Sequence, residues 1–281
     1  MSTACLLFSC NDQPGIVAAI SNFLFEKNLN IIALEQHSEN NIFFTRIEWE
    51  DSGIWSTENL FKKEFKIISK KFDGQISVHF FSKIQTCGLF VSKEPHALLE
   101  ILAKIEMQEF ENIKIPFVIA NHENCKKIVE RYNIPFFYIP TKKNSLNHEK
   151  EQLKIIKKFS PNFIGLARYM KILSKNFIDK SDCPIINIHH SFLPSFVGAN
   201  PYEMAYERGV KLIGATSHFV IPKLDQGPII EQDVTRIGSG YAVDKIKKIG
   251  KDIEKTVFSH ALKKVFEHKV IVHKNRTIVF K

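Results

Sequence analysis

The first 85 residues alternate between two hydrophobic spacings. Apolar side chains recur at every second residue in four segments and at helical spacing in two others. The predicted strands are residues 4–9, 30–36, 42–49 and 75–81, and the predicted helices are residues 16–27 and 60–72. This order of elements, βαββαβ, is that of a ferredoxin-like domain. We assign residues 1–83 to this domain and residues 84–86 to a linker.

From residue 87 the pattern changes to short, continuous apolar runs separated by amphipathic segments. Such runs predict strands buried on both faces, at residues 87–92, 117–121, 136–139, 163–166 and 183–188. The segments between them predict helices at residues 95–104, 123–132 and 149–158. Further elements are predicted at residues 201–208 (helix), 210–220 and 229–236 (strands), 242–266 (helix) and 269–280 (two strands). Residues 87–281 therefore predict an α/β domain with a doubly wound, mostly parallel sheet.

The formal net charge of +9 is unevenly distributed along the chain. Residues 1–86 contain 8 basic and 10 acidic residues, a net charge of −2, and the remaining 31 basic and 20 acidic residues give +11. A basic second half is compatible with nucleic acid, an anionic membrane or an acidic small molecule. The lysines lie in dispersed pairs on helix-like segments, with no nucleic-acid recognition motif between them. We expect an acidic small molecule as partner, and neither nucleic acid nor membrane.

The five cysteines, Cys5, Cys10, Cys87, Cys125 and Cys183, are scattered and form no Cys-x-x-Cys pair. An odd number of dispersed cysteines favours free thiols in a reducing cytoplasm over a disulfide framework or a zinc cluster. The first residues lack the basic segment of a signal peptide, and no apolar run reaches the roughly 18 residues of a membrane span. The sequence predicts a cytoplasmic protein.

Three polar residues are predicted to meet where strands of the second domain end. Asn187 and His189 share one face of a strand because side chains alternate, and Pro194 ends that strand shortly afterwards. Ligands of open α/β sheets bind at this carboxyl edge. Asp225, ahead of a glycine-proline turn, is the third candidate. Each residue alone is common in turns or cores, but an amide, an imidazole and a carboxylate together suffice for chemistry on a one-carbon acyl group.

The junction between the first strand and the first helix has the sequence CNDQPGIV at residues 10–17. It resembles the ACT domain, a module that binds small amino acids and often pairs with a copy of itself. The resemblance implies a regulatory ligand site at Asp12, Gly15 and Ile16, where backbone N–H groups at the helix start could hold a carboxylate. It also implies a homo-oligomer, a dimer or a tetramer. The alternative, a tight turn in a domain that only dimerises, remains open.

Longer motifs in the second domain resemble a second family. The segments NIHHSFLP at 187–194, GATSHFV at 214–220 and DQGPII at 225–230 are similar to the folate-dependent formyltransferase/hydrolase family. The segments VGANPY at 197–202 and YERGV at 206–210, together with the ACT-like domain ahead of them, narrow the resemblance to the formyltetrahydrofolate deformylases within that family.

This resemblance implies hydrolysis of 10-formyltetrahydrofolate to tetrahydrofolate and formate, which would supply formate for purine biosynthesis and balance the one-carbon pool. Asn187 and a protonated His189 would stabilise negative charge on the formyl oxygen, and Asp225 would position and deprotonate the water. The residues that it assigns to substrate binding are Met170, Ile172, Leu173, Val220 and Gly227. No metal or cofactor is implied, since the formylated folate is the substrate.

Two other functions remain open. A formyl transferase would share the three catalytic residues but deliver the formyl group to an amine. A phosphate-bearing acceptor would need a glycine-rich turn after the first strand of the second domain. Residues 91–96 contain no glycine and include Glu94, which favours water as the acceptor. A non-catalytic folate or amino-acid sensor would not need the intact Asn187, His189 and Asp225.

Overall fold

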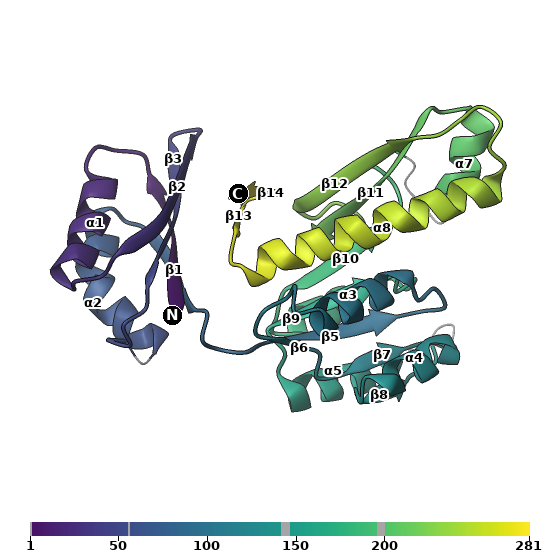
Figure 1. Cartoon of the computed structure of the whole chain (residues 1–281), viewed down its shortest axis with the longest axis horizontal. Coiled ribbons are helices and arrows are strands. Elements are labelled where there is room, and N and C mark those ends of the chain that lie inside the picture. The colour runs from purple at the N-terminus through teal and green to yellow at the C-terminus, as the bar shows by residue number, and fades with distance from the viewer. Residues whose placement is uncertain (1, 56, 142–146, 196–199) are drawn as a thin grey trace. The chain divides into compact units, whose positions relative to one another are not determined.

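The computed structural model describes residues 2–55, 57–141, 147–195 and 200–281 (Figure 1). The chain packs as two units. Unit 1 comprises Met1–Ile84, Lys264–His273 and Thr277–Lys281, and unit 2 comprises Gln85–Lys263 and Lys274–Arg276. No helix in the described ranges combines the length and the apolar composition needed to cross a bilayer.

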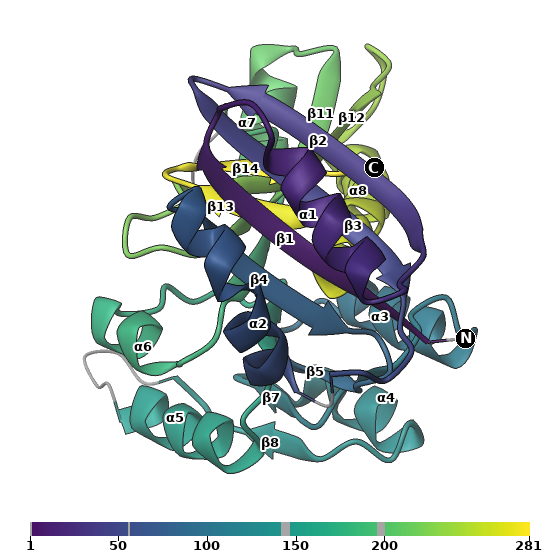
Figure 2. The same cartoon turned by 90° about the vertical axis from the view of Figure 1, so that its left-hand side faces the viewer.

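Unit 1 has the predicted βαββαβ order. Its strands are β1 (Thr3–Asn11), β2 (Ile31–Glu39), β3 (Ile42–Glu50) and β4 (Gln75–Phe80), and its helices are α1 (Ile16–Glu26) and α2 (Glu58–Lys71). The strands form an antiparallel sheet in the order β2-β3-β1-β4. Both helices lie on one face of this sheet (Figure 2). The ferredoxin-like prediction is confirmed, because each helix connects two strands across the same face.

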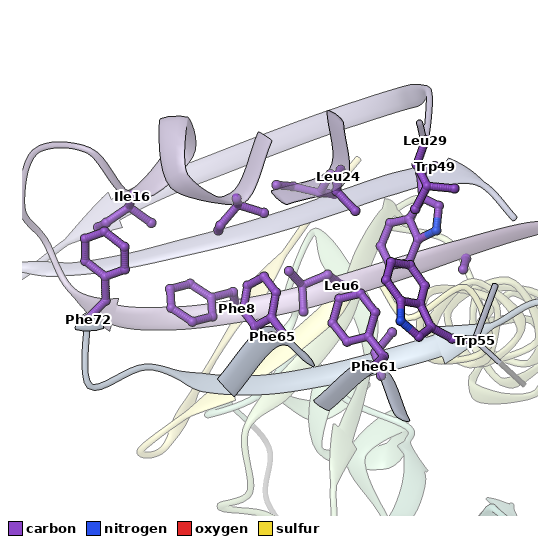
Figure 3. Packing of buried hydrophobic residues seen from close by; sticks show 14 of the residues in the cluster. Leu6, Phe8, Ile16, Leu24, Leu29, Trp49, Trp55, Phe61, Phe65 and Phe72 are labelled. Carbon is purple, nitrogen blue, oxygen red and sulfur yellow. The ribbon is translucent and has the colours of Figure 1, made fainter. Parts of the chain in front are cut away.

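An aromatic-rich cluster fills the space between the sheet and the two helices of unit 1 (Figure 3). Phe61 stacks on Trp49 and on Phe65, with ring centroids 5.5 and 5.3 Å apart. Trp55 meets Phe61 edge to face at 4.8 Å. Phe61 and Phe65 are one helical turn apart and fully buried, which is the spacing that the sequence pattern detected. Burial of apolar surface therefore stabilises this unit.

The other face of the same sheet is covered by the end of the chain. The hairpin of β13 (Val270–His273) and β14 (Arg276–Val279) follows helix α8 (Val243–Phe266). Phe280 packs with Phe44, and buried Arg46 donates from Nε to the carbonyl of His268 at 3.2 Å. Residues 264–273 and 277–281 therefore belong to unit 1, whereas the sequence-based boundaries placed all of 87–281 in the second domain. The alternating hydrophobic pattern predicts such a hairpin but does not specify which sheet the hairpin covers.

Unit 2 contains a sheet of eight strands. The strands are β5 (Gln85–Val91), β6 (Ile113–Lys114), β7 (Val118–Ala120), β8 (Phe136–Tyr138), β9 (Phe163–Ala167), β10 (Ile185–His189), β11 (Leu212–Phe219) and β12 (Ile229–Arg236). The helices are α3 (His96–Glu106), the 3₁₀ turn η1 (Glu123–Cys125), α4 (Lys126–Arg131), α5 (Asn147–Phe159), α6 (Lys175–Lys180), α7 (Pro201–Arg208) and most of α8. The sequence pattern missed β6 and α6, which are too short to show a period.

The strand order β12-β11-β10-β9-β5-β7-β8 confirms a doubly wound, mostly parallel sheet. β5, β7, β8, β9 and β10 run parallel, whereas β11 at one side runs antiparallel to both of its neighbours, β10 and the edge strand β12. The chain adds β7 and β8 on one side of β5, and β9 and β10 on the other. The carboxyl ends of β5 and β9 therefore form a topological switch point, the place where such sheets bind ligands.

Candidate active site

The predicted catalytic residues meet at the carboxyl end of β10. Asn187 and His189 alternate along this strand, and the antiparallel pairing of β10 with β11 sets Asn187 opposite His218. Asp225 lies in the loop between β11 and β12, and its backbone has the left-handed φ of +53°. This conformation is uncommon for a residue other than glycine, and residues held in it concentrate at functional sites.

His189 and Asp225 form a close pair with little access to solvent. Nδ1 of His189 lies 3.5 Å from Oδ2 of Asp225, and the two side chains are 7% and 10% exposed. The second imidazole nitrogen of His189, Nε2, is buried and has no hydrogen-bond partner among the described residues. One nitrogen therefore faces the carboxylate, and the other is left for the substrate or for water.

His218 orients the amide of Asn187. Nδ1 of His218 donates to the carbonyl of Phe219 at 2.9 Å, so Nε2 is the accepting nitrogen of a neutral ring. Nδ2 of Asn187 donates to that Nε2 at 3.3 Å, and its second N–H has no acceptor among the residues that the structure describes. His218 also lies 3.7 Å from Asp225. The sequence analysis quoted His218 within a motif but gave it no role, because its partners are defined only in three dimensions.

Burial sets the charge of the two histidines. It lowers the pKa of His189 below the ordinary histidine value; the Asp225 carboxylate opposes this decrease, and His218 and Arg168 add to it. Burial also lowers the pKa of His218, against the opposing effects of the Phe219 carbonyl and Asp225. Both rings are therefore neutral at neutral pH, whereas the sequence analysis expected a protonated His189.

A cavity of about 320 Å³ opens beside these residues. Its lining includes Asn187, His189, His218 and Asp225, and also the predicted substrate-binding residues Met170, Ile172, Leu173 and Val220. A mostly apolar lining with several convergent polar groups is typical of a small-molecule site. The structure therefore brings the three predicted catalytic residues and four of the five predicted binding residues to one place.

The loop that carries Met170, Ile172 and Leu173 is fastened at three points. The backbone N–H of Met170 donates to Oγ of Ser92 at 3.0 Å. Behind the loop, the amide of buried Gln152 donates to the hydroxyl of Tyr169 at 2.8 Å. Buried Glu149 accepts from the backbone N–H of Ser174 at 2.8 Å. These contacts preorganise the apolar wall of the cavity.

Gly227, the fifth predicted binding residue, is placed differently. Among the described residues it is not part of the cavity lining. A Cβ atom at this position would lie 1.7 Å from the carbonyl oxygen of Phe219, so only glycine allows the loop to pack against β11. Its position indicates a packing role, and its contact with substrate stays a prediction.

The predicted regulatory residues lie at the start of α1. Gly15 caps the helix with a φ of +90°, which accounts for glycine at this turn. The backbone N–H of Asp12 donates to the carbonyl of Asn41 at 2.8 Å. The side chain of Ile16 is buried in the aromatic-rich cluster and can contribute only its backbone to a ligand (Figure 3).

Other motif residues fix the chain after β10. Oγ1 of Thr216 donates to the carbonyl of Ser191 and accepts from the N–H of Leu193. Gln232 donates to both Thr216 and the carbonyl of Leu193. Residues 197–199 of the VGANPY motif lie outside the described residues. The motif residues that can be placed therefore support the end of the catalytic strand.

A second polar cluster, absent from the sequence analysis, borders the cavity. Glu254 of α8 is fully buried; its carboxylate accepts from Nε2 of His96 at 2.8 Å and from the hydroxyl of Tyr202. Nε of Arg168 lies 3.1 Å from the same carboxylate. Burial alone would raise the pKa of Glu254, but the hydrogen bonds and the charge of Arg168 lower it below the ordinary value. The one signal in the sequence that could have indicated this cluster is Glu254 itself, an acidic residue at a position of the amphipathic helix that faces the interior.

Comparisons with known proteins agree with this architecture. Residues 87–262 match the formyl transferase family model, and residues 6–48 match the ACT domain model. A formyltetrahydrofolate deformylase of Bacillus subtilis is 46% identical over 279 residues, which cover 98% of this chain and 93% of that protein. The fold and the site thus define an ACT-containing enzyme of the formyltransferase fold.

Solved structures distinguish between the branches of that fold. A formyltetrahydrofolate deformylase from Pseudomonas syringae is similar with a TM-score of 0.96 and 37% identity, covering 100% of this chain and 95% of that one. A phosphoribosylglycinamide formyltransferase from Anaplasma phagocytophilum reaches a TM-score of 0.63 at 28% identity and covers 71% of this chain and 96% of that one. The chain belongs to the formyltetrahydrofolate deformylase family.

Proposed function

We propose that this protein hydrolyses 10-formyltetrahydrofolate to tetrahydrofolate and formate. The observation that carries the proposal is the convergence of Asn187, His189 and Asp225 on one cavity with an apolar wall. Family membership supplies the substrate, since the full-length relatives are named for this reaction.

The reaction follows from the partners of each group. The free N–H of Asn187 donates to the formyl oxygen as it gains negative charge. Neutral His189 takes a proton from water, and the Asp225 carboxylate stabilises the imidazolium formed on His189. The water oxygen bonds to the formyl carbon, the C–N10 bond breaks, and N10 receives a proton. This assignment makes His189 a base, where the sequence analysis expected a protonated donor.

Water, not an amine, is the acceptor in this proposal. The turn between β5 and α3 has no glycine-rich cradle, and several of its polar side chains are engaged in contacts within the protein. Oγ of Ser92 accepts from Met170, Glu94 pairs with Lys251 at 2.6 Å, and His96 donates to Glu254. The turn therefore lacks the backbone cradle that usually holds a phosphate-bearing acceptor. The transferase-type structure covers about the extent of unit 2 alone, which also favours the deformylase reaction.

The test is formate release from 10-formyltetrahydrofolate with no amine present, wild type beside Asp225→Ala. Turnover without an acceptor that disappears in the variant supports the hydrolase and its carboxylate. Turnover that requires an added amine would favour a transferase. If the folded protein binds the folate but gives no turnover in either condition, the non-catalytic sensor is the function that is favoured.

We also propose that a small amino acid binds unit 1 near Asp12 and Gly15 and modulates the reaction. The support is the ACT match and the left-handed Gly15 turn at the start of α1, since the first backbone N–H groups of a helix have no partner within the helix. Titration of glycine and methionine into a calorimeter and into the formate assay tests it. If the titrations give no heat and no change in rate, the regulatory site is refuted.

Four broader assignments complete the proposal. Formate produced here supplies purine biosynthesis and balances the one-carbon pool, and pairing of ACT domains makes the protein a homodimer or homotetramer. The described cysteines are all free thiols, which suits a reducing cytoplasm. The proposed steps use side-chain acid–base chemistry alone, so no metal or cofactor takes part in them.

A further inference from the structure

Arg168 occupies an unusual position beside the catalytic residues. It follows the last residue of β9, at the topological switch point, with a left-handed φ of +62°. Its side chain is only 11% exposed and lines the catalytic cavity. It also lines an adjoining cavity of about 200 Å³, whose other wall residues include Glu94, Lys251 and Glu254. A small anion formed in the catalytic cavity can therefore reach this side chain.

The guanidinium is held from one side only. Nε lies 3.1 Å from the fully buried carboxylate of Glu254, which His96 and Tyr202 hold in turn. Nε and Nη1 of Arg168 are both buried and have no hydrogen-bond acceptor among the described residues, so Glu254 holds the guanidinium by charge alone. An ion pair buried this deeply is costly to desolvate, and a buried donor without an acceptor adds to that cost. Such an arrangement indicates that a ligand supplies the missing acceptor.

The proposed reaction produces such an acceptor. Hydrolysis joins the water oxygen to the formyl carbon, transfers the C–N10 bonding electrons and one proton to N10, and releases the second proton to solvent. Formate is then an anion beside the Asp225 carboxylate, which repels it. Neutral His189 offers no positive charge to offset that repulsion. Among the described lining residues Arg168 and Lys171 are permanent cations, and Lys171 is exposed and well solvated.

We propose that Arg168 is a further catalytic residue, which binds the carboxylate that forms from the formyl group, and that Glu254 is the residue that positions it. This inference rests on the proposed deformylase function. The planar guanidinium suits a carboxylate, because two parallel N–H groups can donate to its two oxygens. Asn187 then supplies one donor to the reacting oxygen, and Arg168 supplies the charge.

The test compares Arg168→Gln, Arg168→Lys and Glu254→Gln with wild type. The matched control is Lys251→Gln, which removes another cation paired with a glutamate beside the second cavity. Line broadening of ¹³C-labelled formate, recorded with saturating tetrahydrofolate, reports formate binding without turnover. Calorimetry with tetrahydrofolate alone reports the folate site, and thermal melting reports folding.

For Arg168→Gln we expect formate affinity at least about tenfold lower and kcat about a hundredfold lower, with tetrahydrofolate affinity unchanged. Arg168→Lys is expected to recover part of both, since it keeps the charge but loses the paired donors. Glu254→Gln is expected to lower kcat about tenfold, with no further loss when combined with Arg168→Gln. Lys251→Gln should behave as wild type.

Formate binding and kcat at the wild-type level in folded Arg168→Gln would overturn the inference while leaving the deformylase function intact. If that variant does not fold, wild-type formate affinity in both Arg168→Lys and Glu254→Gln overturns it equally. Additive losses in the double variant would overturn the positioning role of Glu254. Failure of the proposed function itself is seen separately, as absence of formate release by the wild type.

Discussion

The core of unit 1 and the carboxyl edge of the unit 2 sheet are equally buried but differ in what they bury. The first holds stacked aromatic rings such as Trp49 and Phe61, whose contacts require only complementary shapes and the exclusion of water. The second holds His189, His218 and Glu254, whose partners must be satisfied one by one. Burial of apolar side chains stabilises the folded state, whereas buried polar groups contribute little to stability and are retained for specific chemistry. Substitutions should therefore separate stability in one region from activity in the other.

The largest separation is expected at Asp225. Asp225→Asn keeps the shape and tolerates the left-handed backbone, so stability should hardly change. Replacing the carboxylate of a His–Asp pair typically lowers kcat about 10⁴-fold, and a similar loss of formate release is expected here. Asp233→Asn on β12, an exposed residue outside the cavity lining, is the control. A variant with more than about a tenth of wild-type kcat would contradict the assignment of Asp225.

The opposite separation is expected at Phe61. Phe61→Ala removes a fully buried ring that four aromatic neighbours contact, which should lower the free energy of unfolding by about 3–5 kcal/mol. The two tryptophans of the chain, Trp49 and Trp55, both lie in unit 1, so their fluorescence during urea unfolding reports on this unit alone.

The control for Phe61 is Ile67→Ala on the same helix, where the side chain is 80% exposed and little change is expected. The kcat of folded Phe61→Ala should equal that of wild type, because the site lies in unit 2. A lower kcat at full folding would show that packing in unit 1 reaches the site.

Gly227 is the position where stability and activity should fall together. An added Cβ would meet the Phe219 carbonyl at 1.7 Å, and that carbonyl fixes the ring of His218. Gly227→Ala should therefore destabilise unit 2 by about 1–3 kcal/mol, measured by thermal melting, and also lower kcat. Gly240→Ala is the control, because a Cβ there meets nothing within 4 Å. Loss of folate binding with unchanged stability would instead support the predicted contact between Gly227 and substrate.

A smaller effect is expected at His218, which acts on the reaction through Asn187. His218→Phe removes the acceptor that orients the Asn187 amide, a loss of about one hydrogen bond and so about a tenfold lower kcat. His218→Gln retains an acceptor and should recover most of the rate. The measurement is kcat beside tetrahydrofolate affinity, since a purely structural effect would lower both. Equal rates in wild type and His218→Phe would exclude an orienting role.

The two regions also differ in how far the sequence specified them. The spacing of Phe61 and Phe65, and the alternation of Asn187 and His189, are local, so element type and the face of each strand followed from the pattern. Asp225 lies on another segment, so its place beside His189 was inferred from complementary chemistry and from the family resemblance, not from a local pattern. The roles of Arg168 and Glu254 depend on contacts between elements distant in sequence. No single-chain pattern encodes such contacts, and the same holds for the C-terminal hairpin on the unit 1 sheet.

The last and smallest test concerns the charge of His189, where burial decides chemistry instead of stability. Burial lowers the pKa of this ring, Asp225 opposes the decrease, and the neutral form is the base in the proposed reaction. kcat/KM should therefore be level from neutral to mildly alkaline pH. As pH falls through the lowered pKa, it should decrease about tenfold per pH unit, because protonation removes the accepting nitrogen. Tryptophan fluorescence and thermal melting at each pH confirm that both units stay folded. A rate that instead declines as pH rises through this range would mean that the protonated ring is the active form, as the sequence analysis expected, and that Asp225 is the base.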